Sequence, residues 1–258
     1  MTKKFFYSCP NLQRVDFPEN SEVRAFYDYC FHSSSIEHLS IPANVKALHS
    51  QWCCSIEKLT SLKVSPKNKF ISYLDNKFLI GKSNSKCDVY DALILARRDI
   101  VSAAIPSFIK EIKPFAFDCC KKLTHVEFTD DSNFEIIDSN AFANSAIKEI
   151  NIPSNVTRIS DHCFDDWNSL KKVIFAENSK LRSILESAFV NKNMTSFVIP
   201  PHVADIESDV FTGFTLLIVE ISENYELHSI NFDMLDVYPP GVVVLPPKLV
   251  NSFKFIFQ

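Results

Sequence analysis

Glycine is scarce in this chain, with 3 glycines among 258 residues against 23 phenylalanines. Glycine-rich loops that hold phosphate need several glycines close together, so a nucleotide site of that kind is nearly excluded. No run of Lys and Arg exceeds two residues and the formal net charge is −4, which argues against nucleic-acid binding. No stretch of about 18 apolar residues is present, so no membrane-spanning helix is expected.

Recognisable chemical motifs are also lacking. The eight cysteines include two adjacent pairs but no Cys-x-x-Cys spacing, so we expect reduced thiols and neither a disulfide framework nor a metal site. The seven histidines show no metal-binding spacing. No nucleophile–base or paired-carboxylate motif stands out, so we predict no catalytic residues, no cofactor and no enzymatic activity.

The dominant feature is a repeated segment of the form apolar-x-x-apolar-x-apolar. Its last apolar residues are 22–24 residues apart, except for one 41-residue step from Val64 to Ile105. The copies are Leu12–Phe17, Ile36–Ile41, Leu59–Val64, a degenerate stretch ending at Ile105, Leu123–Phe128, Ile147–Ile152, Leu170–Phe175, Met194–Ile199, Leu216–Ile221 and a weak copy at Val243–Leu245. A fixed period of this length is typical of solenoid proteins.

Two further regularities accompany the segment. Alternate copies end in Ile-Pro, as at Ile152-Pro153, which gives a second period of 47 residues. Later in most coils a small or apolar residue precedes a phenylalanine, and these phenylalanines are Phe31, Phe117, Phe142, Phe164, Phe189 and Phe211. Equal spacing predicts that they stack from coil to coil as a ladder in the core.

Physically, the segment describes a short strand that is buried on one face, and equal steps allow successive strands to pair in parallel. One coil cannot bury its own apolar face, but stacked coils share a continuous core. We therefore predict a single elongated, curved solenoid of about ten 22–24-residue coils over residues 1–258. Residues 66–100 are predicted to be an insertion between coils, with apolar stretches that suggest a hairpin.

These residues resemble the BspA-like, or Treponema-type, leucine-rich repeat surface antigen family. The Ile-Pro strand ends, segments such as Val156–Ile159 and the Ala-Phe pairs carry the resemblance, which spans nearly the whole chain. It implies an α/β, β-rich repeat solenoid: a right-handed superhelix with a parallel sheet on its concave side and short strands or helical turns on its convex side. It also implies a cell-surface adhesin or antigen that binds host or matrix proteins without catalysis.

A partner is expected on the solvent side of the strands. Segment positions two, three and five should face solvent there. The predicted partner-binding residues, taken from positions three and five, are Arg14, His38, Lys63, His125, Glu127, Glu149, Asn151, Lys172, Ile174, Val198, Ile218 and Glu220. The apolar Ile174, Val198 and Ile218 are expected to be neighbours on this polar surface. They suggest a contact patch, although β-branched residues also suit strands for their own sake, and the tail of the chain could cover them.

Localisation stays open between two hypotheses. The resemblance favours a cell-surface binding module, and two N-glycosylation sequons, at Asn155 and Asn193, would matter there. The unpaired cysteines and the absence of an apolar signal segment near the N-terminus favour an intracellular protein-interaction scaffold in the cytoplasm. Neither end of the chain has a polar capping repeat, so a homodimer through the termini is possible.

Overall fold

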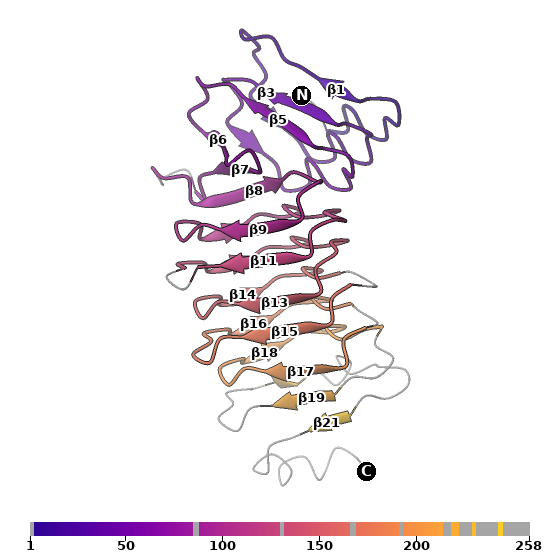
Figure 1. Cartoon of the computed structure of the whole chain (residues 1–258), viewed down its shortest axis with the longest axis vertical. Helices are drawn as coiled ribbons and strands as arrows, with labels where there is room; N and C mark the ends of the chain where they lie inside the picture. The colour runs from indigo at the N-terminus through magenta and orange to yellow at the C-terminus, as the bar shows by residue number, and fades with distance from the viewer. Residues whose placement is uncertain are drawn as a thin grey trace.

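The computed structural model describes residues 3–84, 88–129, 132–165, 169–190, 193–213 and 218–221, and the backbone of 229–230 and 242–244. Every regular element in this part of the chain is a β-strand. Figure 1 shows the long strands from β9 to β21 stacked along the longest axis of the molecule, with β6, β7 and β8 between them and the β1, β3 and β5 sheet. The chain is a β-solenoid with parallel sheets.

One strand of each coil lies within the repeated segment. These long strands are β1 (Arg14–Val15), β3 (His38–Ile41), β5 (Ser61–Val64), β9 (Ser102–Ile105), β11 (His125–Phe128), β13 (Glu149–Ile152), β15 (Lys172–Phe175), β17 (Ser196–Ile199), β19 (Ile218–Ile221) and β21 (Val242–Val244). Neighbours such as β3 and β5 pair in parallel, with Leu39 opposite Leu62. In β9, β13, β17 and β19 exposed and buried residues alternate, which confirms the predicted one-faced burial.

Outside the predicted insertion, the second strand of each described coil has two residues. The short strands are β2 (Ala25–Phe26), β4 (Ala47–Leu48), β10 (Glu111–Ile112), β12 (Ile136–Ile137), β14 (Arg158–Ile159), β16 (Ser183–Ile184), β18 (Asp205–Ile206) and β20 (Ser229–Ile230). The even-numbered strands from β10 to β20 pair in parallel in one sheet, while β2 and β4 form a separate pair. The alternative of short strands, which the resemblance implied, is therefore the one adopted.

The other alternative, helical turns, is wrong for the described residues. The residue just before the small-Phe pair has a positive φ in most coils, as at Asn140 (57°), His162 (52°) and Ser187 (53°), which interrupts any right-handed helix. Every second amide that follows bonds to the next coil, as where Phe142 N–H donates to Cys163 O at 2.9 Å, while the amides between them close turns within their own coil. Coil-to-coil hydrogen bonds thus satisfy part of the backbone that a helix would satisfy within one coil.

The phenylalanine ladder is present from Phe117 to Phe211, whereas Phe31 packs in the core of the first coils against Phe6 and Trp52. Ring centroids are 4.9 Å apart from Phe117 to Phe142, 5.4 Å to Phe164, 5.2 Å to Phe189 and 6.4 Å to Phe211, with the rings nearly parallel at each step. All five side chains are buried. The equal spacing in sequence therefore becomes a stack of rings along the solenoid axis.

Residues of the predicted insertion form three antiparallel strands, β6 (Ile71–Leu74), β7 (Phe78–Gly81) and β8 (Ala92–Ala96). Strand β8 also pairs in parallel with β10, so these strands extend the short-strand sheet. The hydrophobic core is divided here. Phe78 and Ile80 pack into the core of the later coils, while Leu79 and Leu95 pack into the core of the first coils. Both faces of β7 are buried, so it separates two cores.

Arg98, just after β8, connects the two sides of this division. Its side chain is buried, and Nε donates to Ile56 O at 3.0 Å on the N-terminal side. The remaining guanidinium N–H groups donate to Ala116 O at 2.8 Å and Phe115 O at 3.2 Å on the C-terminal side. One cation thus satisfies backbone acceptors from two parts of the solenoid.

The count of about ten coils, the single domain over 1–258 and the dimer through the termini stay predictions. Most of residues 214–258, including the C-terminal end that was considered for the dimer, lie outside the described residues.

Candidate binding surfaces

The solvent side of the long strands is called the long-strand face below. The structure places all twelve predicted partner-binding residues on it. Ten of them are exposed, namely Arg14, Lys63, His125, Glu127, Glu149, Asn151, Lys172, Val198, Ile218 and Glu220, whereas His38 and Ile174 are half-buried. The alternation of the strands accounts for this placement, because positions three and five point away from the core.

Register decides which of these residues meet. Glu149 lies opposite Lys172 on the neighbouring strand. Val198 lies opposite Glu220, and Ile218 lies opposite Ser196, so Ile218 is a diagonal rather than a direct neighbour of Val198. Val198 and Ile218 are 48% and 37% exposed, which is unusual for large apolar side chains on a polar sheet. They form the apolar part of the long-strand face.

A groove of about 400 Å³ opens on this face between β15 and β17, two strands that share no hydrogen-bonded ladder. Its lining includes Ile174 and Val198, together with Val173, Phe175 and the Pro200-Pro201 pair. Val173 and Phe175 occupy positions that the repeat predicts to be core, yet both are only half-buried. Sequence reasoning missed the groove. The one sequence signal is Pro201, where other Ile-Pro coils have Ala or Ser.

A larger cleft of about 620 Å³ lies on the opposite, short-strand side. It opens where β4 fails to join the nine-stranded sheet that begins with β6, β7 and β8. Its lining is Lys46, Ala47, Leu48, His49, Ser50, Trp52, Phe70, Ile71, Gly81, Lys82, Ser83, Asn84, Ile94, Lys113, Pro114 and Asp138. None of these residues was singled out from the sequence, because the cleft joins segments that are far apart in the chain.

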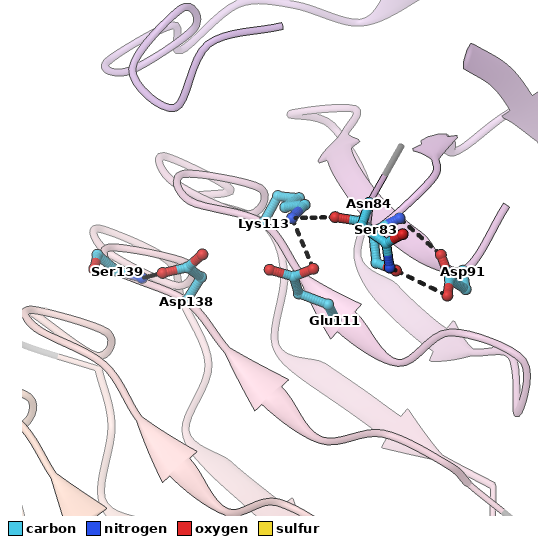
Figure 2. Close-up of polar contacts among 7 residues, drawn as sticks. All are labelled: Ser83, Asn84, Asp91, Glu111, Lys113, Asp138 and Ser139. Carbon is cyan, nitrogen blue, oxygen red and sulfur yellow. Dashed lines mark hydrogen bonds and ion pairs between the residues drawn. The ribbon is translucent and has the colours of Figure 1, made fainter. Parts of the chain in front are cut away.

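A polar network holds one rim of this cleft (Figure 2). Ser83 donates to the buried Asp91 carboxylate twice, through its N–H at 2.8 Å and through Oγ at 3.0 Å. Lys113 Nζ pairs with Glu111 Oε2 at 2.7 Å and lies 3.5 Å from Ser83 O. The loop that follows β7 is thereby fixed to Asp91, just before β8, and to Lys113, just after β10.

The cysteines in the described part of the chain are unpaired, and all but Cys9 are buried. Burial raises the pKa of the Cys30 thiol to about 11 and that of Cys54 to about 12. Burial likewise raises the pKa of Cys53, Cys119, Cys120 and Cys163. These groups stay neutral thiols near pH 7 and make poor nucleophiles. Among the described residues, no group of three or more His, Cys, Asp or Glu could hold a metal ion.

Thiol labelling is a direct test of this arrangement. In native protein treated with iodoacetamide at pH 8, we expect Cys9 to be alkylated and the six buried cysteines described above to react at least about 100-fold more slowly. Peptide mass spectrometry identifies the labelled sites, and labelling in urea provides the control in which all react. Fast native labelling of Cys53 or Cys120 would contradict the buried arrangement.

The two sequon asparagines differ in environment. The Asn155 amide donates from Nδ2 to Ser132 O at 3.0 Å and accepts from Lys180 Nζ at 2.8 Å. A glycan on Nδ2 would disturb this contact between coils, whereas Asn193 is exposed. Asn193 is therefore the better placed acceptor of the two.

Comparison with known proteins identifies the repeat. The sequence model of the family described as "BspA type Leucine rich repeat region" matches in six copies, over residues 1–79 and 95–217. No curated protein sequence matches the chain significantly. No helix in the described residues is long and apolar enough to cross a membrane.

Solved structures share the fold at low sequence identity. The pneumococcal vaccine antigen PcpA is 17% identical with a TM-score of 0.67, covering 97% of this chain and 61% of that one. A leucine-rich cell surface protein from Faecalibacterium prausnitzii is 18% identical (TM-score 0.57; 96% and 64%). A leucine-rich repeat protein from Eubacterium ventriosum is 19% identical (TM-score 0.53; 90% and 63%). This chain therefore spans somewhat less than two thirds of each of these structures.

Proposed function

Because the chain belongs to the BspA-type leucine-rich repeat family, we propose that it is a non-enzymatic protein-binding module that acts at a cell surface. The partner would be a host or matrix protein, bound on the long-strand face. Two of the similar structures, a vaccine antigen and a cell surface protein, support this choice of setting. The specific support from this chain is the groove between β15 and β17.

The groove combines features that suit a protein contact. It places the half-buried Ile174 beside the exposed Val198, and Val173 and Phe175 supply further apolar surface below them. Removing such surface from water on binding contributes roughly 25 cal/mol per Å² before the costs of association. Apolar surface surrounded by polar residues is a common property of protein-binding sites.

Charge around the groove indicates the chemistry of the partner. Glu177 lines the groove, Glu220 lies opposite Val198, and Glu149 lies opposite Lys172. The carboxylates of Glu177 and Glu220 therefore lie beside the apolar residues of the groove. A protein segment that presents an apolar side chain flanked by Lys or Arg would complement this surface, and its association would weaken with added salt.

Substituting threonine for Val198 and Ile218 tests this proposal, since threonine keeps the β-branched shape that suits a strand while adding a hydroxyl. We expect the double variant to fold normally and to bind its partner at least about tenfold more weakly, a loss of roughly 1.4 kcal/mol. Binding would be measured by interferometry against a panel of purified matrix proteins.

The matched control is Val101→Thr, which changes another exposed valine, 60% exposed and outside the groove. It should leave the affinity unchanged. Equal binding by the wild type and the double variant would remove the groove from the proposal, and loss of binding in Val101→Thr as well would point to a nonspecific effect.

An intracellular scaffold is the second candidate, favoured by the unpaired cysteines. Burial of six of the seven described thiols weakens that argument, because buried thiols are also protected in an oxidising compartment. Protease and antibody accessibility on intact source cells separates the two candidates: exposed epitopes favour the surface module, while full protection favours the scaffold. A homodimer stays a proposal, and a monomeric elution profile at high concentration would count against it.

A further inference from the structure

The cleft on the short-strand side brings together three parts of the chain that the repeat alone would keep apart. They are the turn around β4, the insertion strands with the loop after β7, and the turns that follow β10 and β12. At about 620 Å³ the cleft falls within the roughly 300–1,000 Å³ that is usual for small-molecule sites. It lies on the other side of the solenoid from the groove discussed above, so it calls for a separate ligand.

The cleft carries an excess of positive charge. Lys46, Lys82 and Lys113 line it against the single carboxylate of Asp138. The side chains of Lys82 and Lys113 are only 26% and 29% exposed, so their charges are less screened than those of surface lysines. Glu111 compensates Lys113 at 2.7 Å, while Asp88 pairs with Lys82 only at 3.6 Å and is itself fully exposed.

Lys46 is the cation best placed to meet a ligand. Its ammonium lies 5.3 Å from the centroid of the Phe70 ring, and no carboxylate of the described chain lies within 4.0 Å of it. Phe70 is 37% exposed and offers an apolar ring at the same edge of the cleft. Ser50 and Asn84 add side chains that can donate to and accept from hydroxyl groups.

We propose that this cleft binds an anionic saccharide of one or two rings that carries a carboxylate or sulfate group. The ammonium groups would hold the anion, the Phe70 ring would pack against the apolar face of a sugar ring, and the polar side chains would meet its hydroxyls. A neutral sugar would lack the first contact, and an inorganic anion would lack the other two.

The test is a titration of the full chain with each probe, monitored by calorimetry and by tryptophan fluorescence, because Trp52 lines the cleft. The probes are a sulfated uronic-acid disaccharide, the unsulfated uronic-acid disaccharide, lactose, sodium sulfate and a tetrapeptide of glutamate. The cleft variant is Lys46→Gln with Lys82→Gln. Lys113 is kept, because Lys113→Gln would leave the half-buried Glu111 carboxylate without its cationic partner. Lys148→Gln with Lys171→Gln is the control, because it removes the same charge from two exposed lysines outside the cleft.

We expect at least one of the two acidic disaccharides to bind the wild type, with affinity reduced roughly 10- to 100-fold in the cleft variant and by less than about twofold in the control. Comparison of the sulfated with the unsulfated disaccharide then shows whether the cleft binds a sulfate or a carboxylate group. Equal losses in both variants would reduce the effect to nonspecific charge attraction and overturn the proposal. It is also overturned if no disaccharide binds, or if lactose, sulfate or the glutamate peptide binds as tightly as the acidic disaccharides.

Discussion

Replacing Arg98 with methionine is expected to lower the free energy of unfolding by about 3–5 kcal/mol, a shift in melting temperature on the order of 10 °C. Methionine fills much of the volume but donates no hydrogen bond. The carbonyl groups of Ile56, Phe115 and Ala116 would then lose a buried donor. Ile56 O is then left unsatisfied, at a cost of roughly 1–3 kcal/mol, while Ala116 O and Phe115 O lose a charged donor but each keep a backbone N–H.

A buried charge does not always stabilise a fold, and replacing buried ion pairs with apolar residues is often neutral. Arg98 differs because the acceptors that it satisfies belong to the backbone, so no side-chain substitution can remove them. The control is Arg97→Met. Arg97 is half-buried, pairs with Asp99 at 2.6 Å and donates to one backbone carbonyl, Asn76 O, so its loss should cost less, about 1–2 kcal/mol. Urea denaturation followed by circular dichroism compares the two, and equal costs would refute the proposed role of Arg98 at the boundary between the cores.

Truncation of the phenylalanine ladder should have an effect of similar size. Phe142 is 1% exposed and stacks between Phe117 at 4.9 Å and Phe164 at 5.4 Å. Phe142→Ala is expected to cost about 3–5 kcal/mol, from lost burial and the cavity that remains. Two aromatic contacts are lost at once, and each is worth about 0.5–1.5 kcal/mol beyond its buried area.

Two companion variants make this result interpretable. Phe142→Leu keeps most of the apolar volume and should cost clearly less than the alanine variant, while Phe108→Ala removes a phenylalanine that is 47% exposed and should cost under about 1 kcal/mol. Because each coil contacts only its neighbours, hydrogen exchange should rise first at the amides around β12 and β14. Uniform faster exchange along the whole solenoid would contradict a local ladder.

Much of the solenoid could be predicted because its determinants recur within about 24 residues. Burial at Ile150 and Ile152, exposure at Glu149 and Asn151, and stacking at Phe142 all follow from a pattern that each coil repeats. The choice between helical turns and short strands could not be predicted in this way. It depends on positive φ at residues such as Asn140 and on hydrogen bonds to the next coil, which the apolar pattern does not encode.

The sequence predicted the long-strand face but neither the groove nor the cleft, because only the face follows from the repeat. The position of Val198 and Glu220 on the long-strand face follows from alternation along a strand, although their contact with a partner stays a prediction. The groove depends on the missing ladder between β15 and β17 and on the incomplete burial of Phe175. The lysine-lined cleft depends on how the insertion packs between the two cores.

By itself the sequence determined the repeat, the buried and exposed faces of the long strands and the ladder of rings, because nearest-neighbour stacking makes these properties periodic. Only the tertiary structure decided where that periodicity fails. Strand β7 buries both faces, Arg98 joins backbone from two cores, and Lys46 and Lys113 line one cleft. Such contacts join residues tens of positions apart without a common period, so they arise from packing and register, which only the folded chain specifies.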